Sequence, residues 1–368
     1  MKILYISQLE QGCTARARML ALQRMGHEIV PLDTNAYATK NRILGKLAFL
    51  LSAGPNVQRL NRDILRLAAQ HRPDLLWADK VLQLQPATVL RCRAMGIQTV
   101  CYMIDNAFGP RRDSGLRLYK KSIPSFDLHC TQRDISVADL KQRGARDVIK
   151  IQTAYDRVAH FPPPEGWSDA NRDREVSFIG SPYDDRAGFL SRLSQAGFPV
   201  VISGAERAWK KALPPASFAR LFREGELMDE AYRNGIWRSK INLSFLTKSN
   251  QDEVAHKSFE IAGCGGFLMV ERCEGHLSRF VEDQEAVFFS TLEECIRKIA
   301  LYLPDEAARE RIARAGHERA ERSGYHNDHQ LSLILDRLQS LREHSTNNQQ
   351  PTTSNQQPAT SNQQLPTQ

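Results

Sequence analysis

Two acidic residues, Asp252 and Glu260, flank a short polar stretch whose residue types could bind a sugar and a phosphate. A carboxylate in a crevice can accept hydrogen bonds from vicinal hydroxyls, such as those of a ribose or a hexose. Lys257 lies one helical turn before Glu260 and could neutralise a phosphate. Acidic residues are also favourable at a solvated helix start that binds nothing. These residues alone leave a binding site and an ordinary helix start as alternatives.

The residues that follow predict a helix, a glycine-rich turn and a strand. Residues 258–262 suit a helix, which Gly263, Gly265 and Gly266 would stop. Residues 267–270 form an uninterrupted apolar run, short enough for a strand buried on both faces. Glycines would let a ligand approach the backbone closely, and the helix start would offer free N–H groups to an anion. We therefore expect Gly265 and Gly266 to contribute to the same binding site.

A longer set of residues around this stretch follows a known pattern. It consists of Lys257-Ser-Phe-Glu-Ile-Ala-Gly-Cys-Gly-Gly-Phe-Leu268, Leu277-Ser-Arg-Phe280, Glu285 and Leu292-Glu-Glu294. The segment resembles the D/E-x7-E signature of retaining GT-B glycosyltransferases. More closely, it resembles the C-terminal half of the CgeB-like (spore-maturation-type) glycosyltransferases, over about residues 172–325. Lys257 stands where that family usually has Arg, which keeps the charge but loses bidentate geometry.

The resemblance implies an α/β fold of the GT-B type. Two Rossmann-like domains would face a central cleft, and a C-terminal helix would cross back to the N-terminal domain. The implied activity moves a sugar from a nucleotide-diphosphate sugar to a glycan, lipid-linked or protein acceptor. Such a site needs no metal or other cofactor, because fixed positive groups neutralise the leaving diphosphate. Retention of configuration is suggested by the signature only.

The resemblance also implies roles for particular residues. Glu260 would accept hydrogen bonds from ribose hydroxyls, and Asp252 would bind the donor sugar. Lys257 and Arg186 would neutralise the diphosphate, together with the N–H groups of helix starts. Asp252 is one methylene shorter than the commoner Glu, and Glu253 is adjacent, so either acid could occupy that position.

Composition and charge bound the class of protein. The 368 residues leave room for two domains, and 41% hydrophobic with 25% charged residues are globular values. The seven scattered cysteines form no C-x-x-C pair, which favours reduced thiols in the cytoplasm and no metal site. Residues 1–160 carry 25 Lys and Arg against 13 Asp and Glu, a net charge of +12. This basic half suggests an anionic partner, such as a phospholipid surface at the inner face of the membrane, but an ordinary solvated surface is the alternative.

The first half alternates strands and helices. Residues 2–6 predict a strand, residues 8–14 a loop around Gly12, and residues 15–25 a helix before the next strand. By resemblance, the Gly12 loop faces the cleft on the acceptor side. Residues 98–104 predict a strand that delivers Asp105 and Asn106 at its C-terminal end, where ligands bind in open α/β sheets. Asp105 is thus a candidate for contacting the sugar or the acceptor, with a turn that caps the strand as the alternative. Residues 42–51 could form a helix on a membrane surface, although a packed helix is favoured.

The second half repeats the rhythm after a proline-rich linker at residues 154–174. Gly180 and Ser181 follow a predicted strand at residues 175–179, and Arg186 begins the next helix, so these three residues could line a diphosphate pocket. We expect an N-terminal domain at 1–160, a C-terminal nucleotide-sugar domain at 172–325 and a crossing helix at 326–344. Residues 345–368 contain a three-fold repeat without charge after residue 347, and we expect a disordered tail.

Two other classes of function are compatible with parts of this sequence. A catalytically inactive GT-B protein that binds nucleotide or acts as a scaffold would explain the departures at Asp252 and Lys257. A nucleic-acid-binding protein would explain the pI near 9.2. The basic residues are dispersed along helices, however, and no aromatic-interleaved recognition motif occurs, so we expect no nucleic-acid partner.

Overall fold

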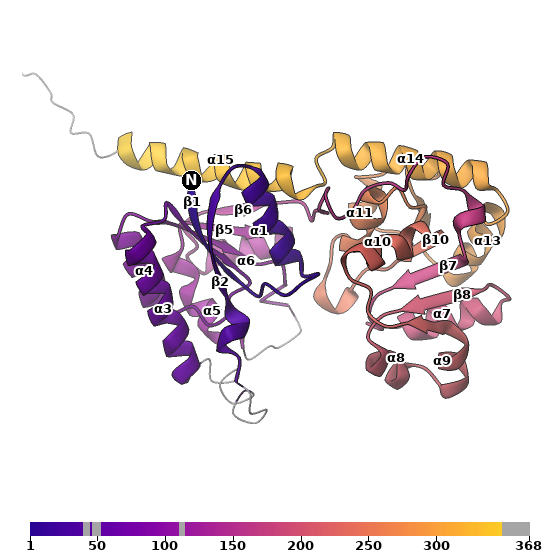
Figure 1. Cartoon of the computed structure of the whole chain (residues 1–368), viewed down its shortest axis with the longest axis horizontal. Coiled ribbons are helices and arrows are strands. Elements are labelled where there is room, and N and C mark those ends of the chain that lie inside the picture. Colours follow the sequence, from indigo (N-terminus) through magenta and orange to yellow (C-terminus); the bar gives the residue numbers. More distant parts are fainter. Residues whose placement is uncertain (40–44, 46–52, 110–114, 348–368) are drawn as a thin grey trace, which may run out of the picture.

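The computed structural model describes residues 1–39, 45, 53–109 and 115–347. These residues form two α/β domains, each built on a parallel sheet of six strands. The domains lie side by side along the long axis of the molecule (Figure 1). Of residues 42–51 only residue 45 is described, so the expectation for that segment stays a prediction. Of the tail expected at 345–368, residues 345–347 belong instead to the last helix of the chain, and residues 348–368 lie outside the described residues.

The first sheet has the strand order β2-β1-β3-β4-β5-β6, and all its strands are parallel. The order reverses beside β1, which creates a switch point between β1 and β3 where ligands bind in such sheets. The strands are β1 (Lys2–Ser7), β2 (Glu28–Asp33), β3 (Leu75–Asp79), β4 (Gln98–Tyr102), β5 (Leu128–Thr131) and β6 (Val148–Lys150). The helices around them are α1 (Thr14–Arg24), α3 (Pro55–His71), α4 (Pro86–Ala94), α5 (Leu116–Ser122) and α6 (Asp134–Gln142).

The second sheet has the order β12-β11-β10-β7-β8-β9, again all parallel, with its switch point between β7 and β10. Its strands are β7 (Arg174–Ile179), β8 (Val200–Ser203), β9 (Phe222–Glu224), β10 (Ser239–Ser244), β11 (Leu268–Glu271) and β12 (Val287–Phe289). Its helices are α7 (Arg186–Gln195), α8 (Glu206–Ala212), α9 (Pro215–Leu221), α10 (Asp229–Trp237), α11 (His256–Gly263), α12 (Glu274–Leu277), α13 (Leu292–Tyr302) and α14 (Glu306–Arg322).

Each sheet is buried on both faces, because each domain contains two separate clusters of buried apolar side chains. Strands buried in this way read as continuous apolar runs rather than as alternating patterns. This is why the run at residues 267–270 predicts a strand, and β11 confirms it.

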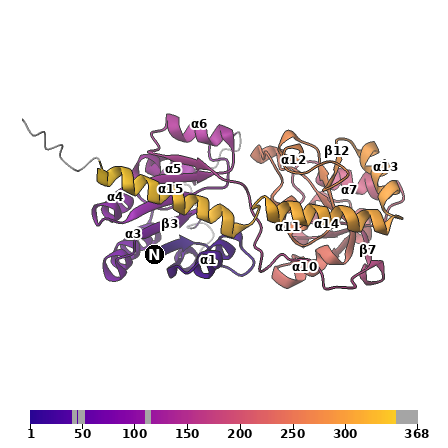
Figure 2. The ribbon, with the colours of Figure 1, turned by 90° about the horizontal axis from the view of Figure 1, so that it is seen from above.

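The last helix, α15 (Asn327–Asn347), crosses back from the second domain to the first (Figure 2). Its buried side chains Leu331, Ile334 and Leu338 pack into the core of the first domain with Tyr5 and Trp77. The predicted architecture, with two parallel sheets and a helix that returns to the N-terminal domain, is confirmed.

The chain passes between the domains twice, and the two passages are bonded together. The backbone N–H of Tyr155 donates to the carbonyl of Tyr325, and the N–H of Asn327 donates to the carbonyl of Tyr155. We call residues 151–160 the hinge segment. Ile151 is buried in the core of the first domain, whereas Tyr155 is buried in that of the second. No helix among the described residues is long and apolar enough to cross a membrane.

Candidate active site

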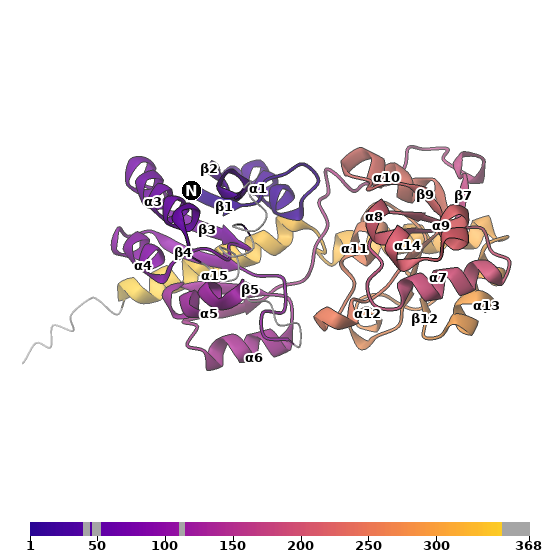
Figure 3. The same cartoon turned by 90° about the horizontal axis from the view of Figure 1, so that it is seen from below.

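A cavity of about 680 Å³ lies between the two domains. The first domain contributes the loop after β1, around Gly12, and one face of α1. The second domain contributes the loops after β7 and β10 and the start of α11, and residues 156–160 of the hinge segment complete the wall. Because these loops follow strands at the switch points of both sheets, the cavity occupies the position where open α/β sheets bind ligands. Figure 3 shows the two domains from below, on either side of the hinge. We call this cavity the cleft.

Glu260 lies on the wall of the cleft, with only 8% of the residue exposed. Its Oε2 accepts a hydrogen bond of 2.6 Å from the hydroxyl of Tyr232 on α10. Its Oε1 lies 3.1 Å from Nε2 of His256, one turn earlier on the same helix. His256 in turn contacts the hydroxyl of Thr153 in the hinge segment, at 2.5 Å from Nδ1. Two partners leave capacity on a carboxylate that can accept about four hydrogen bonds.

The charge of Glu260 is protected by its surroundings. Burial by itself raises the pKa of this carboxyl group, but His256 and Lys257 outweigh burial and hold the pKa well below its usual range. Glu260 is therefore an ionised acceptor in the cleft.

Two cations in the same cleft have no carboxylate partner within ion-pair distance among the described residues. Lys257 Nζ lies 4.6 Å from the centre of the Tyr232 ring and 3.4 Å from its hydroxyl. Burial lowers the pKa of Lys257 below its usual value. Arg186, which is 8% exposed, donates to the carbonyls of Ser181, Phe245 and Leu246, and its Nε has no partner. Burial likewise lowers the pKa of Arg186. Positive charge that no direct ion pair neutralises attracts an anionic ligand.

Gly180 and Ser181 lie at the end of β7 and line the cleft, as the sequence predicts. A Cβ on Gly180 would lie 3.3 Å from Cε of Lys257, so a larger residue would press on this cation. Gly204, after β8, also lines the cleft and packs its backbone against Gly180: a Cβ there would lie 2.2 Å from the Gly180 carbonyl oxygen. Both glycines thus permit a close backbone approach.

Asp252 also borders the cleft, but its Oδ1 is engaged by the first domain. It forms an ion pair with Arg133 and accepts a hydrogen bond of 2.9 Å from Asn250 Nδ2. Glu253 does not line the cleft: its carboxylate pairs with Lys150 at 2.7 Å and accepts from the N–H of Asp134 at 2.6 Å. Of the two adjacent acids, Asp252 is therefore the one at the cleft.

The acceptor-side residues are divided between two cavities. Gly12 lines the cleft, where a Cβ would lie 2.7 Å from the sulfur of Met228 across the domain boundary. Asp105 instead lines a neighbouring cavity of about 130 Å³ that also contains Asp252. Its Oδ2 pairs with Lys80 at 2.5 Å. Asn106 is buried, and its Nδ2 donates to Gln251 of the second domain at 2.7 Å. Neither residue lines the cleft itself.

Gly265 and Gly266 are not brought to the cleft, contrary to the prediction. They lie at the C-terminal end of α11 and line a separate cavity of about 470 Å³. Gly265 adopts the left-handed conformation (φ +62°), and the N–H of Gly266 donates to Ile261, so both serve the predicted stop of the helix. The length of α11 separates them from the cleft, because the ligand-facing end of the helix is its start.

Comparison with known proteins gives one family match over part of the chain and several similar structures. Residues 186–336 match the family model described as glycosyl transferase-like. The whole structure is similar to sucrose-phosphate synthase from Thermosynechococcus elongatus, with a TM-score of 0.65 and 12% identity over 92% of this chain and 99% of that chain. It is also similar to Anabaena Alr3699/HepE in complex with UDP and glucose, with a TM-score of 0.64 and 14% identity over 92% and 100% of the two chains. The chain has the GT-B fold.

A further similar structure is the α,α-trehalose 6-phosphate synthase from Burkholderia multivorans, with a TM-score of 0.59 and 12% identity over 96% of this chain and 99% of that chain. A sequence comparison with curated proteins gives no match. Among the described residues of this GT-B chain, no group of three or more His, Cys, Asp and Glu side chains is arranged to hold a metal ion. A site that works without metal stays a prediction.

Several residues that line the cleft or support its wall carry no mark in the sequence. Tyr232 comes from α10 and fixes both Glu260 and Lys257. His160 comes from the hinge segment, with Nε2 at 3.9 Å from Glu260 Oε1. Trp209 is fully buried and donates from Nε1 to the Gly180 carbonyl at 2.8 Å. Each is a single residue in an ordinary helix or loop, so no spacing pattern marks it.

The start of α11 is held by a buried histidine, which gives a testable dependence on pH. His276 is fully buried; its Nε2 accepts from the N–H of Ala255 at 3.0 Å, while Nδ1 lies 2.9 Å from the Glu271 carbonyl. Burial lowers the pKa of His276 to about 4. In the unfolded chain a histidine titrates near 6.5, so the unfolded state binds more protons between these values. We expect His276 to contribute its full stability above about pH 6.5 and to lose it as the pH falls towards 4.

The measurement is the melting temperature of the wild type and of His276→Gln between pH 7 and pH 4. Other buried histidines, such as His129, also have a lowered pKa, so both proteins should lose stability on acidification. The expected difference is a shallower decline in the variant, because it lacks one of the groups that take up a proton on unfolding. Parallel curves would show that His276 does not titrate on unfolding.

Proposed function

We propose that the chain is a glycosyltransferase that moves a sugar from a nucleotide-diphosphate sugar to an acceptor. The observation that carries the proposal is the joint placement of three groups in one cleft at the switch points of both sheets. The ionised carboxylate of Glu260 lies in the same cleft as two cations, Lys257 and Arg186. Neither cation forms an ion pair with a carboxylate of the described residues. A nucleoside diphosphate offers the matching groups, because it carries ribose hydroxyls next to a dianionic leaving group.

In this mechanism Glu260 binds the ribose. Tyr232 bonds to one carboxylate oxygen and His256 to the other, and together they orient the carboxylate. The remaining lone pairs of the two oxygens accept hydrogen bonds from two ribose hydroxyls. Charge-assisted hydrogen bonds of this kind are shorter and stronger than neutral ones.

The leaving diphosphate lies between the starts of α7 and α11. Arg186 and Lys257 stand at these helix starts, where free N–H groups and the helix dipole also favour negative charge. Fixed positive groups that meet charge as it develops on the leaving oxygen lower the barrier without having to reorganise. Arg186 and Lys257 thus supply the positive charge that a metal ion provides in other enzymes. Asp252 binds the donor sugar.

Finer expectations follow from the resemblance and from similar structures. We expect a CgeB-like transferase of hexosyl or related units, with retention of configuration. UDP-sugars are the first donors to test, because the similar Anabaena structures contain UDP, UDP with glucose, or UDP-glucose. The acceptor is a glycan, a lipid-linked or a protein acceptor, in keeping with a role in cell-surface glycan synthesis. The basic first half favours a cytoplasmic protein with peripheral contact to the inner face of the membrane.

The test is release of nucleoside diphosphate from UDP-, GDP- and dTDP-sugars by the purified full chain, with candidate acceptors added in turn. Turnover of one donor would establish a transferase and name its base. Tight nucleotide binding without turnover, with every acceptor tested, would favour the inactive GT-B scaffold. That alternative is also favoured by Asp252 and Lys257, which differ from the residues usual at these positions in the resembled pattern. A chain that binds no nucleotide at all would contradict both functions.

A further inference from the structure

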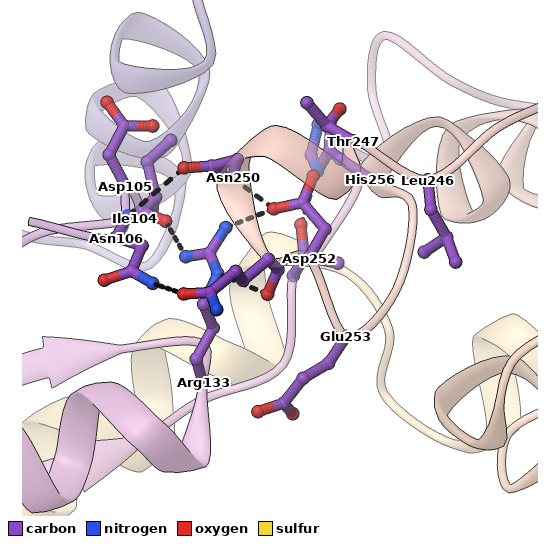
Figure 4. A network of polar contacts seen from close by, with 12 residues as sticks. Ile104, Asp105, Asn106, Arg133, Leu246, Thr247, Asn250, Asp252, Glu253 and His256 are labelled. Atoms are coloured by element: carbon purple, nitrogen blue, oxygen red, sulfur yellow. Dashed lines mark hydrogen bonds and ion pairs between the residues drawn. The ribbon is translucent and has the colours of Figure 1, made fainter. Parts of the chain in front are cut away.

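Residues 250–253 of the second domain fasten it to the first, and we call them the clasp (Figure 4). The side chain of Gln251 accepts from Asn106 Nδ2 at 2.7 Å, and its backbone carbonyl accepts from Arg133 Nε at 3.3 Å. Gln251 is held in the left-handed region, at φ +52°. That conformation costs a residue with a side chain on the order of 1 kcal/mol, so the contacts made across the boundary maintain it.

Arg133 is the centre of the clasp contacts. It precedes α6 at the C-terminal edge of the first sheet and is only 4% exposed. Its three guanidinium nitrogens have three different partners: Nε donates to Gln251, one terminal nitrogen to the carbonyl of Ile104 and the other to Asp252. A planar guanidinium with all of its nitrogens engaged holds a fixed orientation. Asp252 therefore meets a rigid partner that belongs to the opposite domain.

The position of Asp252 gives this pair a consequence for the cleft. Asp252 borders both the cleft and the smaller cavity beside Asp105. Arg133 and Asn250 both donate to its Oδ1, and no described residue donates to its Oδ2. The carboxylate is thus held by one oxygen and keeps the other for a ligand. Without Arg133, only the hydrogen bond from Asn250 would hold this side chain.

We propose that Arg133 is a positioning residue for the transfer reaction, supplied by the domain opposite the nucleotide. It orients the Asp252 carboxylate for the donor sugar, and it does so only while the clasp is docked on the first domain. The sugar site thus depends on a residue of the first domain, whereas Glu260, Lys257 and Arg186 all belong to the second domain. This inference rests on the proposed function, because it assigns Asp252 to the donor sugar.

A double-mutant cycle on Arg133 and Asp252 tests the inference. In donor hydrolysis we expect Arg133→Ala to lower kcat about 30-fold and Asp252→Asn about 100-fold. Because Arg133 acts through Asp252, the double variant should be about as slow as Asp252→Asn alone. Arg133→Lys should recover only part of the loss, because an ammonium cannot engage three partners in a plane. UDP affinity should change less than about threefold in Arg133→Ala, since Arg133 contacts none of the nucleotide-binding groups.

The matched control is Arg93→Ala, which breaks an Arg–Asp ion pair of 2.7 Å with Asp127 inside the first domain. Its kcat should stay within about twofold of the wild type. If the effects of Arg133→Ala and Asp252→Asn multiply in the double variant, or if Arg133→Ala matches the control, the inference is wrong.

Small-angle scattering on the same variants separates this inference from the proposed function. Arg133→Ala should increase the radius of gyration relative to the wild type and Arg93→Ala. The clasp loses its bonds from Arg133 to Gln251 and Asp252 and keeps only those to Asn106, Lys150 and Asp134, so it holds the domains less firmly. If the wild type binds no nucleotide, the proposed function fails, and the positioning role of Arg133 in the reaction fails with it. An unchanged radius in Arg133→Ala, with nucleotide binding intact, would instead overturn the clasp alone.

Discussion

Glu260→Gln weakens the binding of UDP about 100-fold, equivalent to about 2.7 kcal/mol. The substitution keeps the volume of the side chain but removes the charge that strengthens hydrogen bonds to both ribose hydroxyls. It also replaces one acceptor oxygen by an NH2 group, which can accept neither from the Tyr232 O–H nor from a ribose hydroxyl. The measurement is calorimetric titration with UDP and with uridine. Both ligands should lose affinity by a similar factor, because both carry the ribose.

The Gln variant is preferable to Ala, which would leave Tyr232 and His256 without their partner at a cost of about 1–3 kcal/mol each. Glu294→Gln is the matched control. Glu294 lies on α13 of the same domain, pairs with Arg272 at 2.8 Å and does not line the cleft. Its UDP affinity should equal that of the wild type within twofold. An unaltered affinity in a folded Glu260→Gln protein would remove Glu260 from the donor site.

Lys257→Met lowers the affinity for UDP about 30-fold and leaves that for uridine nearly unchanged. Lys257 meets only the diphosphate, so the nucleoside does not sense its charge. Met keeps an unbranched apolar side chain and removes the ammonium group, which lies over the Tyr232 ring. The affinity of the wild type for UDP should fall as salt is added, and that of the variant should fall less.

Lys257→Arg provides the conservative comparison, because it replaces one positively charged side chain by another. It should bind UDP within about fivefold of the wild type, because the charge is kept. Together the two substitutions separate the parts of the site: Glu260→Gln affects both ligands, whereas Lys257→Met affects only the phosphorylated one. Equal losses for UDP and uridine in Lys257→Met would show that Lys257 supports the fold of the site rather than the diphosphate.

Much of the fold could be predicted because its signals are local. The apolar run at residues 267–270 and the glycines before it identify a buried strand and the end of a helix, and β11 and α11 lie there. The place of Gly180, Ser181 and Arg186 at the cleft could be predicted in the same way. They follow a strand at a switch point, and such residues face the ligand in a doubly wound sheet.

Local signals do not decide the role of a residue type that suits two different structures. Gly265 and Gly266 were equally suited to a ligand approach and to a helix stop, and only the direction of α11 shows that they face away from the cleft. Asp105 follows its strand as predicted, but the salt bridge with Lys80 and the clasp place it in a side cavity. Arg133 also follows a strand of the first sheet, so its position could have been predicted, whereas its pairing with Asp252 depends on how the two domains meet.

The most direct measurement is a crystal structure of the full chain with UDP. We expect the ribose hydroxyls within hydrogen-bonding distance of the Glu260 carboxylate and the diphosphate between Lys257 and Arg186. Its phosphate oxygens should also face the start of α7 or α11. A nucleotide bound outside this cleft, or a ribose turned away from Glu260 in a fully occupied site, would contradict the account.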